Sequence, residues 1–526
     1  MYLSLYISTF LLKWAGAFAS CRYPLTENWR ACKVSSDGQC FPAVVPGTVL
    51  STLLHNKIWN LTDPFFEQDL MKIPDIANVG PDFYTYSFSL QFDIDNFRCD
   101  EVDGSNKRVL LNFKGINYRA NISVNGIVLS QSSDQSGMFQ SRNLDVTSHL
   151  NPDGSINELF VVVFPPDQVG VPNGAQGGDH EIARNGAIHQ FAAGWDWIQA
   201  SPDRNTGLSF FLLIYLVRPN MKTCKIFCIH LIIVYILTYL FQGIWDKVEL
   251  VLTGSVSLSY PYVRVAYLSL QDLTASLDMR VIVSCSEGVA TSGLLKARIY
   301  SPAGVLVLDN ITSAFSVSTD DTEVAQEVTF PLATIQNVEL WYPHTHGPQR
   351  LYTVEMEAEV SKDQAEGKAN SGDISDSITV EVGIRSVEPY LHDVTKSQAF
   401  KINGEDVFLV GGNWIATDQF LRFSRGDRIS RERYWNEVKF HRDMGFNLIR
   451  VWGGGLAETS EFYEACDRLG VFVFQEFWMT GDNNGRWGGN YTWPDDHDSY
   501  LSNAKDVIVS RRNHASLLLW LVILLF

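Results

Sequence analysis

The sequence predicts a multidomain β plus α/β protein, with two antiparallel β-sandwiches followed by the first half of a (β/α)8 TIM barrel. Three observations support this. Short alternating β runs separated by turn residues fill residues 84–164, and a second block of such runs fills residues 245–387. After Pro389, β runs alternate with amphipathic helices, which is typical of a parallel sheet with crossover helices.

Composition excludes several classes of protein. The 526 residues suggest three or four domains, and the 46% hydrophobic and 19% charged shares are ordinary for globular proteins. The formal net charge of −18 repels phosphate backbones, so we expect no nucleic-acid partner. The 12% aromatic share suits a sugar-stacking cleft, but it suits plain β-sandwich cores equally well.

The amino-terminal residues 1–20 resemble a signal peptide. An apolar run over 2–12 precedes the A-x-A pattern of residues 17–19, which predicts a secreted or lumenal protein of the lysosome or vacuole type. Lys13 interrupts the run and no positive charge precedes it, so a cytoplasmic location is the alternative. Sequons stand at Asn60, Asn121, Asn310 and Asn490, but chance alone would supply two or three.

Residues 208–243 form an apolar insertion between two β segments. The run from Ile226 to Phe241 has 16 residues, which is marginal for a bilayer that needs about 20. Both flanks are typical of one sandwich, and a membrane span would place its two parts on opposite sides. We therefore expect no membrane partner and interpret the insertion as lineage-specific or as translated read-through. A membrane-anchored lectin is the alternative.

Three domains follow from the order of the runs. Residues 21–207 hold the first sandwich, with β runs FYTYSFSLQF, RVLLNFKGI, RANISVNGIVL and ELFVVVF. Residues 244–387 hold DKVELVLTG, MRVIVSCS, LLKARIYSPAGVLVL, LYTVEMEAEV and DSITVEVGIRSVE, a length that fits one immunoglobulin-like sandwich. Residues 388–526 hold the β/α block.

The β/α block predicts four strands and three helices. The strands are expected over Asp406–Trp414, Phe446–Trp452, Val471–Phe477 and Ser516–Leu525, and the helices over Ser430–Met444, Ala457–Leu469 and Asp498–Arg512. A Rossmann sheet also fits this alternation, but no G-x-G-x-x-G follows a strand. Polar and aromatic residues gather at the carboxyl ends of the strands, which favours a barrel.

These strand ends predict a sugar-binding pocket. Hydrolysis of a glycosidic bond generally requires two carboxylates that flank the bond, while polar groups and aromatic rings hold the sugar. The candidates at the strand ends are Asn413, Trp414, Asp418, Arg450, Trp452, Glu476 and Trp478. The structural alternative is that a strand-end Trp caps the core and that Arg450 forms an ion pair.

The segment AGWDWIQ adds Trp195 and Asp196 as candidates. On a strand, neighbouring side chains face opposite ways, whereas a loop could aim both at one pocket. No G-x-S-x-G or Walker A motif is present, and His344 and His346 lie in a Pro- and Gly-rich turn. We therefore expect no cofactor and no metal.

Several long motifs carry a family resemblance. They are LNFKGINYRANISVNG, VELWYPHTHGPQRLYTVE, GWDWIQASPDRNTG with IWDKVEL, GGNWIATDQFLRFS, FHRDMGFNLIRVWGGGLAETSEFYEACDRLGVFVFQEFWMTGD and DHDSYLSNAKDVIVSRRNHASLLLW. Over roughly residues 41–207 and 244–520 the chain resembles glycoside hydrolase family 2. It is most similar to the β-mannosidase branch, especially the mannosylglycoprotein endo-β-mannosidases. The resemblance implies a galactose-binding-like jelly roll as the first domain.

The same resemblance implies a retaining mechanism on a β-mannoside oligosaccharide or N-glycan. Asp196 and Trp195 match the segment that reaches the mannose, and Asn413, Trp414, Asp418, Trp452 and Glu476 match strand-end positions. Exo-β-glucosaminidase, β-galactosidase and non-catalytic carbohydrate binding are the alternatives.

The family's acid/base Glu lies in a Gly-Gly-Asn-Glu stretch just after the Trp that matches Trp520, and its nucleophile Glu belongs to a later strand. Here Trp520 is followed by Leu-Val-Ile-Leu-Leu-Phe. The resemblance therefore implies that both catalytic Glu residues are absent. We expect a chain truncated within the barrel and without glycosidase activity.

Overall fold

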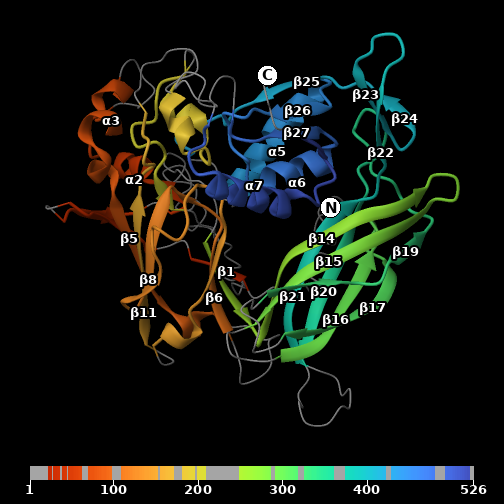
Figure 1. Ribbon diagram of the computed structural model, residues 1–526, viewed down its shortest axis with the longest axis horizontal. Helices are drawn as coiled ribbons and strands as arrows, with labels where there is room; N and C mark the ends of the chain where they lie inside the picture. The colour runs from red at the N-terminus through yellow and green to blue at the C-terminus, as the bar shows by residue number, and fades with distance from the viewer. Residues whose placement is uncertain are drawn as a thin grey trace, which may run out of the picture.

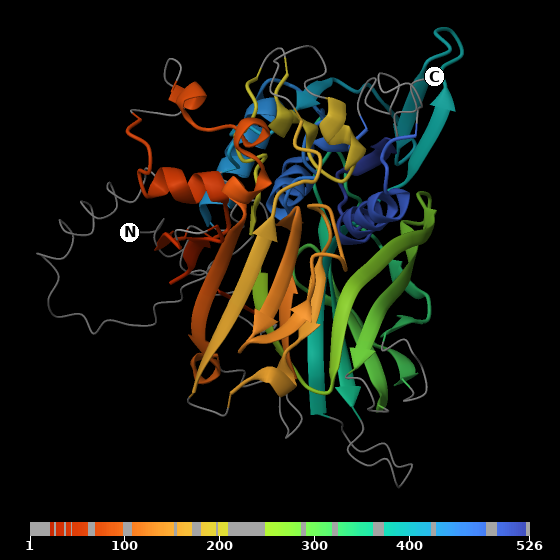
Figure 2. The same ribbon diagram turned by 60° about the vertical axis from the view of Figure 1, so that its left-hand side comes forward.

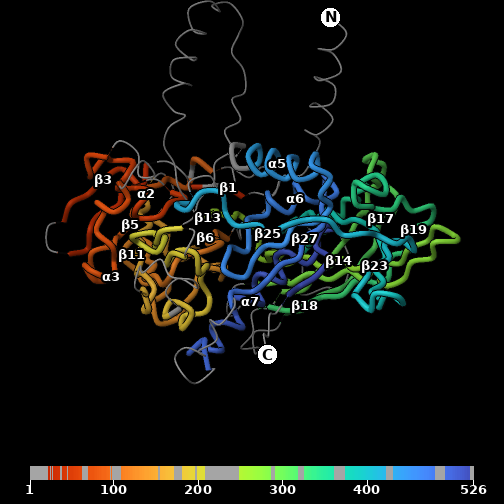
Figure 3. Tube along the Cα trace, turned by 90° about the horizontal axis from the view of Figure 1, so that it is seen from above, coloured from red at the N-terminus to blue at the C-terminus, as the bar shows by residue number. Residues whose placement is uncertain are grey.

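The computed structural model shows a multidomain, mostly β protein. It describes residues 22–25, 28–35, 38–43, 45–61, 69–97, 108–151, 155–170, 180–195, 198–208, 248–285, 291–317, 325–360, 373–421, 428–479 and 492–521. Two β bodies stand side by side, and a layer of helices and parallel strands lies across their upper ends (Figures 1 and 2). Seen from above, this layer occupies the space between the two β bodies (Figure 3).

The first β body is a sandwich of two antiparallel sheets. One sheet has the order β1 (Arg22–Pro24), β13 (Val248–Thr253), β6 (Arg108–Phe113) and β10 (Arg142–Asp145). The other has the order β3 (Cys40–Pro42), β2 (Arg30–Lys33), β5 (Tyr86–Asp93), β11 (Ile156–Phe164), β8 (Arg119–Val124) and β9 (Ile127–Ser130). The predicted alternation is seen in β11, where Leu159, Val161 and Val163 are buried and Glu158 and Phe160 are exposed.

Short elements close the upper end of this sandwich. Strands β4 (Gly47–Thr48), β12 (Gly207–Leu208) and β7 (Ile116–Asn117) form a small sheet, beside helices α2 (Val49–His55) and α3 (Ile76–Val79).

Strand β13 corrects the predicted domain boundary. The sequence placed DKVELVLTG in the second block, but β13 pairs with β6 of the first sandwich, from Val248↔Phe113 to Thr253↔Arg108. Val248 and Leu250 are buried in the core of the first sandwich. Alternation along a strand predicts which residues are buried, but it does not say which sheet receives them.

The second β body pairs two further antiparallel sheets. Strands β14 (Val256–Ser269), β15 (Thr274–Cys285), β18 (Ala325–Thr329) and β19 (Ala333–Gln336) form one sheet. The other has the order β17 (Leu306–Val317), β16 (Thr291–Tyr300), β20 (Leu351–Val360) and β21 (Asp373–Gly383). Leu277 and Met279 from the first sheet pack with Ile299 and Val354 from the second. A small sheet of β22 (Val387–Leu391), β23 (Gln398–Ile402) and β24 (Glu405–Val407) follows.

The β/α alternation is confirmed in the third body. Strands β25 (Gly411–Trp414), β26 (Leu448–Val451), β27 (Phe472–Glu476) and β28 (Leu517–Leu521) pair in parallel and in sequence order. The connecting helices are α5 (Arg428–Asp443), α6 (Ser460–Leu469) and α7 (His497–Arg511). The predicted single strand over Asp406–Trp414 is wrong, because β24 belongs to the preceding sheet and β25 opens the parallel one.

Helix α7 and the turn after it join all three bodies. The Asn503 side chain accepts a hydrogen bond from Phe139 N and donates one to Ser136 O of the first sandwich. Asn513 Oδ1 accepts from Val263 N of the second. Within the described ranges no helix is long and apolar enough to cross a membrane, and residues 209–243 lie outside those ranges.

Candidate functional site

Three predicted site residues meet at the carboxyl ends of β25, β26 and β27. Arg450 Nη1 donates to Asn413 Oδ1 over 3.0 Å, and Arg450 Nη2 lies 2.9 Å from each carboxylate oxygen of Glu476. The register places Asn413 opposite Arg450 on neighbouring parallel strands, so the side chains share one face of the sheet. The strand order therefore brings together residues that are 63 positions apart at the extremes.

The charges of this cluster are unequally exposed. The Glu476 side chain is 0% exposed, whereas the Arg450 side chain is 31% exposed. The backbone N–H of Gly453 also donates to Glu476 Oε2 over 2.7 Å, so the carboxylate has a cation and a backbone donor as partners. Asn413 and the partly exposed Arg450 side chain therefore face solvent, while the buried Glu476 carboxylate fixes the position of the guanidinium.

An aromatic pair lies beside the strand ends. The rings of Trp195 and Trp452 meet edge to face, with centroids 5.0 Å apart and planes at 77°. Trp452 directly follows β26, while Trp195 comes from the first sandwich domain. Trp195 Nε1 is a buried donor with no partner in the described part of the chain. Asp196, the other residue predicted from this segment, lies outside the described residues.

Trp414 and Trp478 do not join this cluster. Trp414 is buried on the helix-facing side of β25, against Tyr434 and Phe462, and its Nε1 donates to Glu458 Oε1 over 2.8 Å. Trp478 is buried and stacks on Phe139, with centroids 3.9 Å apart. Both positions agree with the structural alternative, in which a strand-end Trp caps the core. Successive residues of a strand face opposite sides, so Trp414 points away from its neighbour in the cluster.

Asp418 lies in the loop that follows β25. Its side chain is buried and accepts a hydrogen bond from Phe420 N over 3.1 Å. The next residue, Gln419, offers its carbonyl to Ser201 Oγ and to Asn205 Nδ2 of the first sandwich domain. The loop that carries Asp418 is therefore held by the sandwich rather than by the parallel sheet alone.

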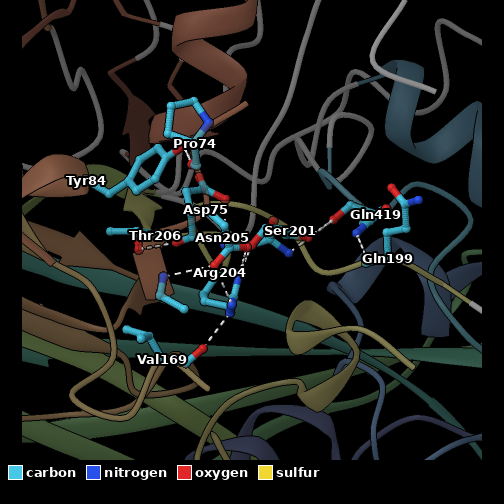
Figure 4. A network of polar contacts seen from close by, with 12 residues as sticks. Pro74, Asp75, Tyr84, Val169, Gln199, Ser201, Arg204, Asn205, Thr206 and Gln419 are labelled. Atoms are coloured by element: carbon cyan, nitrogen blue, oxygen red, sulfur yellow. Dashed lines mark hydrogen bonds and ion pairs between the residues drawn. The ribbon is translucent and has the colours of Figure 1, made fainter. Parts of the chain in front are cut away.

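Arg204 anchors the segment that makes these contacts (Figure 4). It is fully buried, and its guanidinium contacts both carboxylate oxygens of Asp75 over 2.9 and 3.0 Å and the carbonyls of Val169 and Ser201. Sequence reasoning quoted the motif SPDRNTG but did not separate Arg204 from possible sugar contacts. Only its burial and its partners show that it supports the site from within.

Glu458 is a second residue that the sequence reasoning missed. It is fully buried before α6 and accepts hydrogen bonds from Trp414 Nε1 and the Tyr434 hydroxyl. The pKa of Glu458 is raised to about 7, chiefly by burial and to a smaller extent by nearby Glu437, while the hydrogen bonds from Tyr434 and Trp414 oppose the rise. No group of three or more His, Cys, Asp or Glu that could hold a metal ion occurs in the described ranges.

Comparison with known proteins agrees with this arrangement. Residues 29–208 match the family model described as "Glycosyl hydrolase 2 galactose-binding domain-like". Over 490 residues the chain is 37% identical to the mannosylglycoprotein endo-beta-mannosidase of Lilium longiflorum, and this alignment covers 91% of the chain and 44% of the relative. The chain is thus similar to this family model over residues 29–208, and to a protein named as an endo-β-mannosidase over most of its own length.

Two further proteins with β-mannosidase in their names are similar to the chain. Beta-mannosidase B of Thermothelomyces thermophilus is 25% identical over 521 residues, covering 94% of this chain and 49% of the relative. The crystal structure of the β-D-mannosidase from Dictyoglomus thermophilum matches with a TM-score of 0.67 and 25% identity, covering 95% of this chain and 52% of that one. The chain thus spans about half the length of the glycoside hydrolase 2 proteins it matches.

Proposed function

We propose that the chain supplies the sugar-binding side of a retaining glycoside hydrolase 2 enzyme that acts on β-mannosides, free or within an N-glycan. The observation that carries the proposal is the bridging position of Arg450 between Asn413 and Glu476 at the strand ends. Relatives whose names state β-mannosidase activity support the substrate class.

Each member of the cluster has a proposed role. Asn413 and Arg450 are the exposed polar groups that hydrogen-bond ring hydroxyls, and Glu476 keeps the guanidinium in place. The Trp195–Trp452 pair supplies the apolar surface on which a sugar ring packs. We propose Asp196, which directly follows Trp195 in the chain, as a further sugar contact. Asp418 positions the loop after β25.

The domain organisation is proposed along the same lines. We assign a jelly roll to residues 21–207 together with β13, an immunoglobulin-like sandwich to the β strands up to residue 387, and the first half of a (β/α)8 barrel to residues 388–526. Two features support the barrel: the parallel strands follow in sequence order, and residues of α5, α6 and α7 pack in one core with Ile449, Val451 and Val473. A doubly wound sheet would carry helices on both faces.

We further propose that this 526-residue chain binds β-mannosides without hydrolysing them. A retaining glycosidase needs two carboxyl groups roughly 5 to 5.5 Å apart across the bond. In the described strand-end cluster the carboxylate of Glu476 is engaged by Arg450 and Gly453, and the buried Glu458 lies outside the cluster, behind Trp414. Neither is placed to act as the acid or the nucleophile.

The experiment uses the purified 526-residue chain. Titration with β-1,4-mannobiose in a calorimeter should give saturable binding, and 4-nitrophenyl β-mannoside should release no nitrophenol above the buffer rate. Absence of binding would contradict the sugar-site proposal. Release of nitrophenol that an active-site mannoside inhibitor suppresses would contradict the proposal that the chain does not hydrolyse.

A glucosaminide substrate is the competing proposal, because an exo-beta-D-glucosaminidase of Arthroderma benhamiae is 24% identical over 90% of the chain. A glucosamine ring carries an ammonium group. The charged group that the described cluster exposes is the Arg450 guanidinium, which has no hydrogen-bond acceptor for that ammonium group. We therefore expect the β-1,4-linked disaccharide of glucosamine to compete poorly with mannobiose for the site. Equal competition would favour a glucosaminide as the substrate.

We also infer a secreted or lumenal location. The disulfide between Cys32 and Cys40 joins the hairpin of β2 and β3, and structural disulfides persist in oxidising compartments. Alkylation of the unreduced protein followed by peptide mapping tests this. A protein purified from its native source with both thiols free would contradict the inference.

A further inference from the structure

The four sequons differ in how the structure places them. Asn310, in the sequon Asn310-Ile311-Thr312, is exposed on β17, and Thr312 is exposed as well. Asn121 lies on β8, between β11 and β9, and its Oδ1 accepts a hydrogen bond from Ser132 N over 2.7 Å. The third residue of that sequon, Ser123, donates its hydroxyl to Phe160 O. Thr62 of the Asn60 sequon lies outside the described residues, as do Asn490 and Tyr491 of the Asn490 sequon.

The backbone at Asn310 departs from regular strand geometry. Ala297↔Ile311 is followed by Ile299↔Leu308, so β17 carries one extra residue at this point, and Asn310 has φ +56°. Asparagine tolerates this left-handed conformation better than most residues. Its backbone N–H is held by Asp309 Oδ1 over 2.8 Å, while the side-chain amide stays exposed at the bulge.

The surface beside Asn310 combines an unpaired strand edge with exposed apolar side chains. Among the described strands, β17 stands at the edge of its sheet, so its outer N–H and C=O groups lack strand partners. The hairpin tip just before Asn310 exposes three apolar side chains, Val305 at 61%, Leu306 at 45% and Val307 at 38%. An apolar tip on an open edge strand is a site for intermolecular strand pairing.

We propose that Asn310 is an N-glycosylation site, and that its glycan covers the free edge and the apolar tip of the β16–β17 hairpin. In the modification, the amide nitrogen of Asn310 forms a bond to the anomeric carbon of N-acetylglucosamine. The bond from that carbon to the diphosphate of a polyprenyl-linked oligosaccharide donor breaks. The amide loses one proton, and the lipid diphosphate departs. Asn121 is not modified, because its amide oxygen and its strand are already engaged.

This proposal is independent of the sugar-binding site. It rests on passage through the secretory pathway, which the Cys32–Cys40 disulfide supports. The experiment supplies that passage directly: the full chain is secreted from cultured eukaryotic cells behind a cleavable signal sequence. Peptides are then mapped by mass spectrometry after endoglycosidase H, which leaves one N-acetylglucosamine on each occupied Asn.

The variants isolate the sequon at Asn310. Thr312→Ala and Asn310→Asp should each remove one glycan from the intact protein, and Thr312→Ser should retain it. Asn310→Asp keeps a residue type that accepts positive φ, and Asn121→Gln should leave the glycan count unchanged. Secreted wild-type protein with an unmodified Asn310 peptide would overturn the proposal, as would a glycan on Asn121.

The role of the glycan has its own readout. Enzymatic removal of the glycan from folded wild-type protein should raise the rate of aggregation measured by light scattering, with no change in circular dichroism. Replacing the apolar tip by Val305→Lys and Val307→Lys should abolish that increase. Equal aggregation rates before and after glycan removal would overturn the covering role.

Discussion

The indole N–H of Trp414 lies 2.8 Å from Glu458 Oε1, on the side of β25 opposite to the face that Asn413 shares with Arg450. The end of β25 therefore contributes side chains to both faces of the parallel sheet. Its odd-numbered residue Asn413 contributes to the exposed polar cluster, and the next residue locks the strand to α5 and to the segment before α6. Changes on the two sides should have separable effects.

Replacing Arg450 should damage both binding and stability. In Arg450→Met the carboxylate of Glu476 remains buried without its cation, which should lower the free energy of unfolding by about 3 to 5 kcal/mol. Mannobiose affinity should fall roughly tenfold or more, because charge-assisted hydrogen bonds are lost. The double variant Arg450→Met/Glu476→Met should regain stability in urea denaturation but not affinity. A double variant as unstable as the single one would contradict the ion-pair account.

Glu458 should make stability depend on pH. Its pKa is raised to about 7 in the folded protein from an ordinary value near 4.5, so its stabilising contribution is present below about pH 4.5 and is lost as pH rises through 7. The loss is on the order of 3 kcal/mol. Glu458→Gln should flatten this part of the profile of melting temperature against pH. Parallel wild-type and variant profiles would show that Glu458 does not titrate in this range.

His189 should act in the opposite direction. It is fully buried between Met138 Sδ and Asn205 Nδ2, and burial lowers its pKa from 6.5 to about 3. The folded protein holds His189 in its neutral form. The contribution of His189 to stability is therefore present above pH 6.5 and is lost as pH falls toward 3. The cost is about 2 kcal/mol at pH 5. His189→Gln should reduce the fall in melting temperature between pH 6.5 and 5, and an unchanged fall would contradict the prediction.

Arg204 should be far more sensitive to substitution than a surface arginine. Arg204→Lys loses the two-pronged contact with Asp75 and leaves carbonyls without donors, so unfolding should become easier by about 3 kcal/mol. The matched control is Arg264→Lys: the Arg264 guanidinium is exposed and Asp278 keeps Arg280 as a second partner, so the loss should be about 0.5 kcal/mol or less. Chemical denaturation of both variants measures the difference, and similar losses would argue against the anchoring role.

The spacing of apolar residues along short stretches of the chain was enough to predict many helices and strands of the fold. The helix predicted over Ser430–Met444 is α5, and the strand predicted over Val471–Phe477 is β27, each within about two residues at its ends. Such elements are defined by the spacing of apolar residues along a short stretch, which the sequence displays directly. The family resemblance was read from long motifs and agrees with the relatives found by comparison.

The candidate site was predicted only as a set of residues. Strand ends identified Asn413, Arg450 and Glu476, but not that Arg450 joins the other two. Trp414 and Trp478 fit the same pattern and yet lie in the core. A single residue at the end of a strand can face either side, because the exact strand boundary decides its direction.

By itself, the sequence determined the two β blocks, the parallel β/α block and the candidate strand ends, because all of these depend on residues close together in the chain. Only the tertiary structure decided which sheet received Val248–Thr253, which way Trp414 faced, and which cation neutralised Glu476. These outcomes depend on partners far apart in sequence, such as Val248 with Phe113. The burial and pairing of such partners set the free energy of each arrangement.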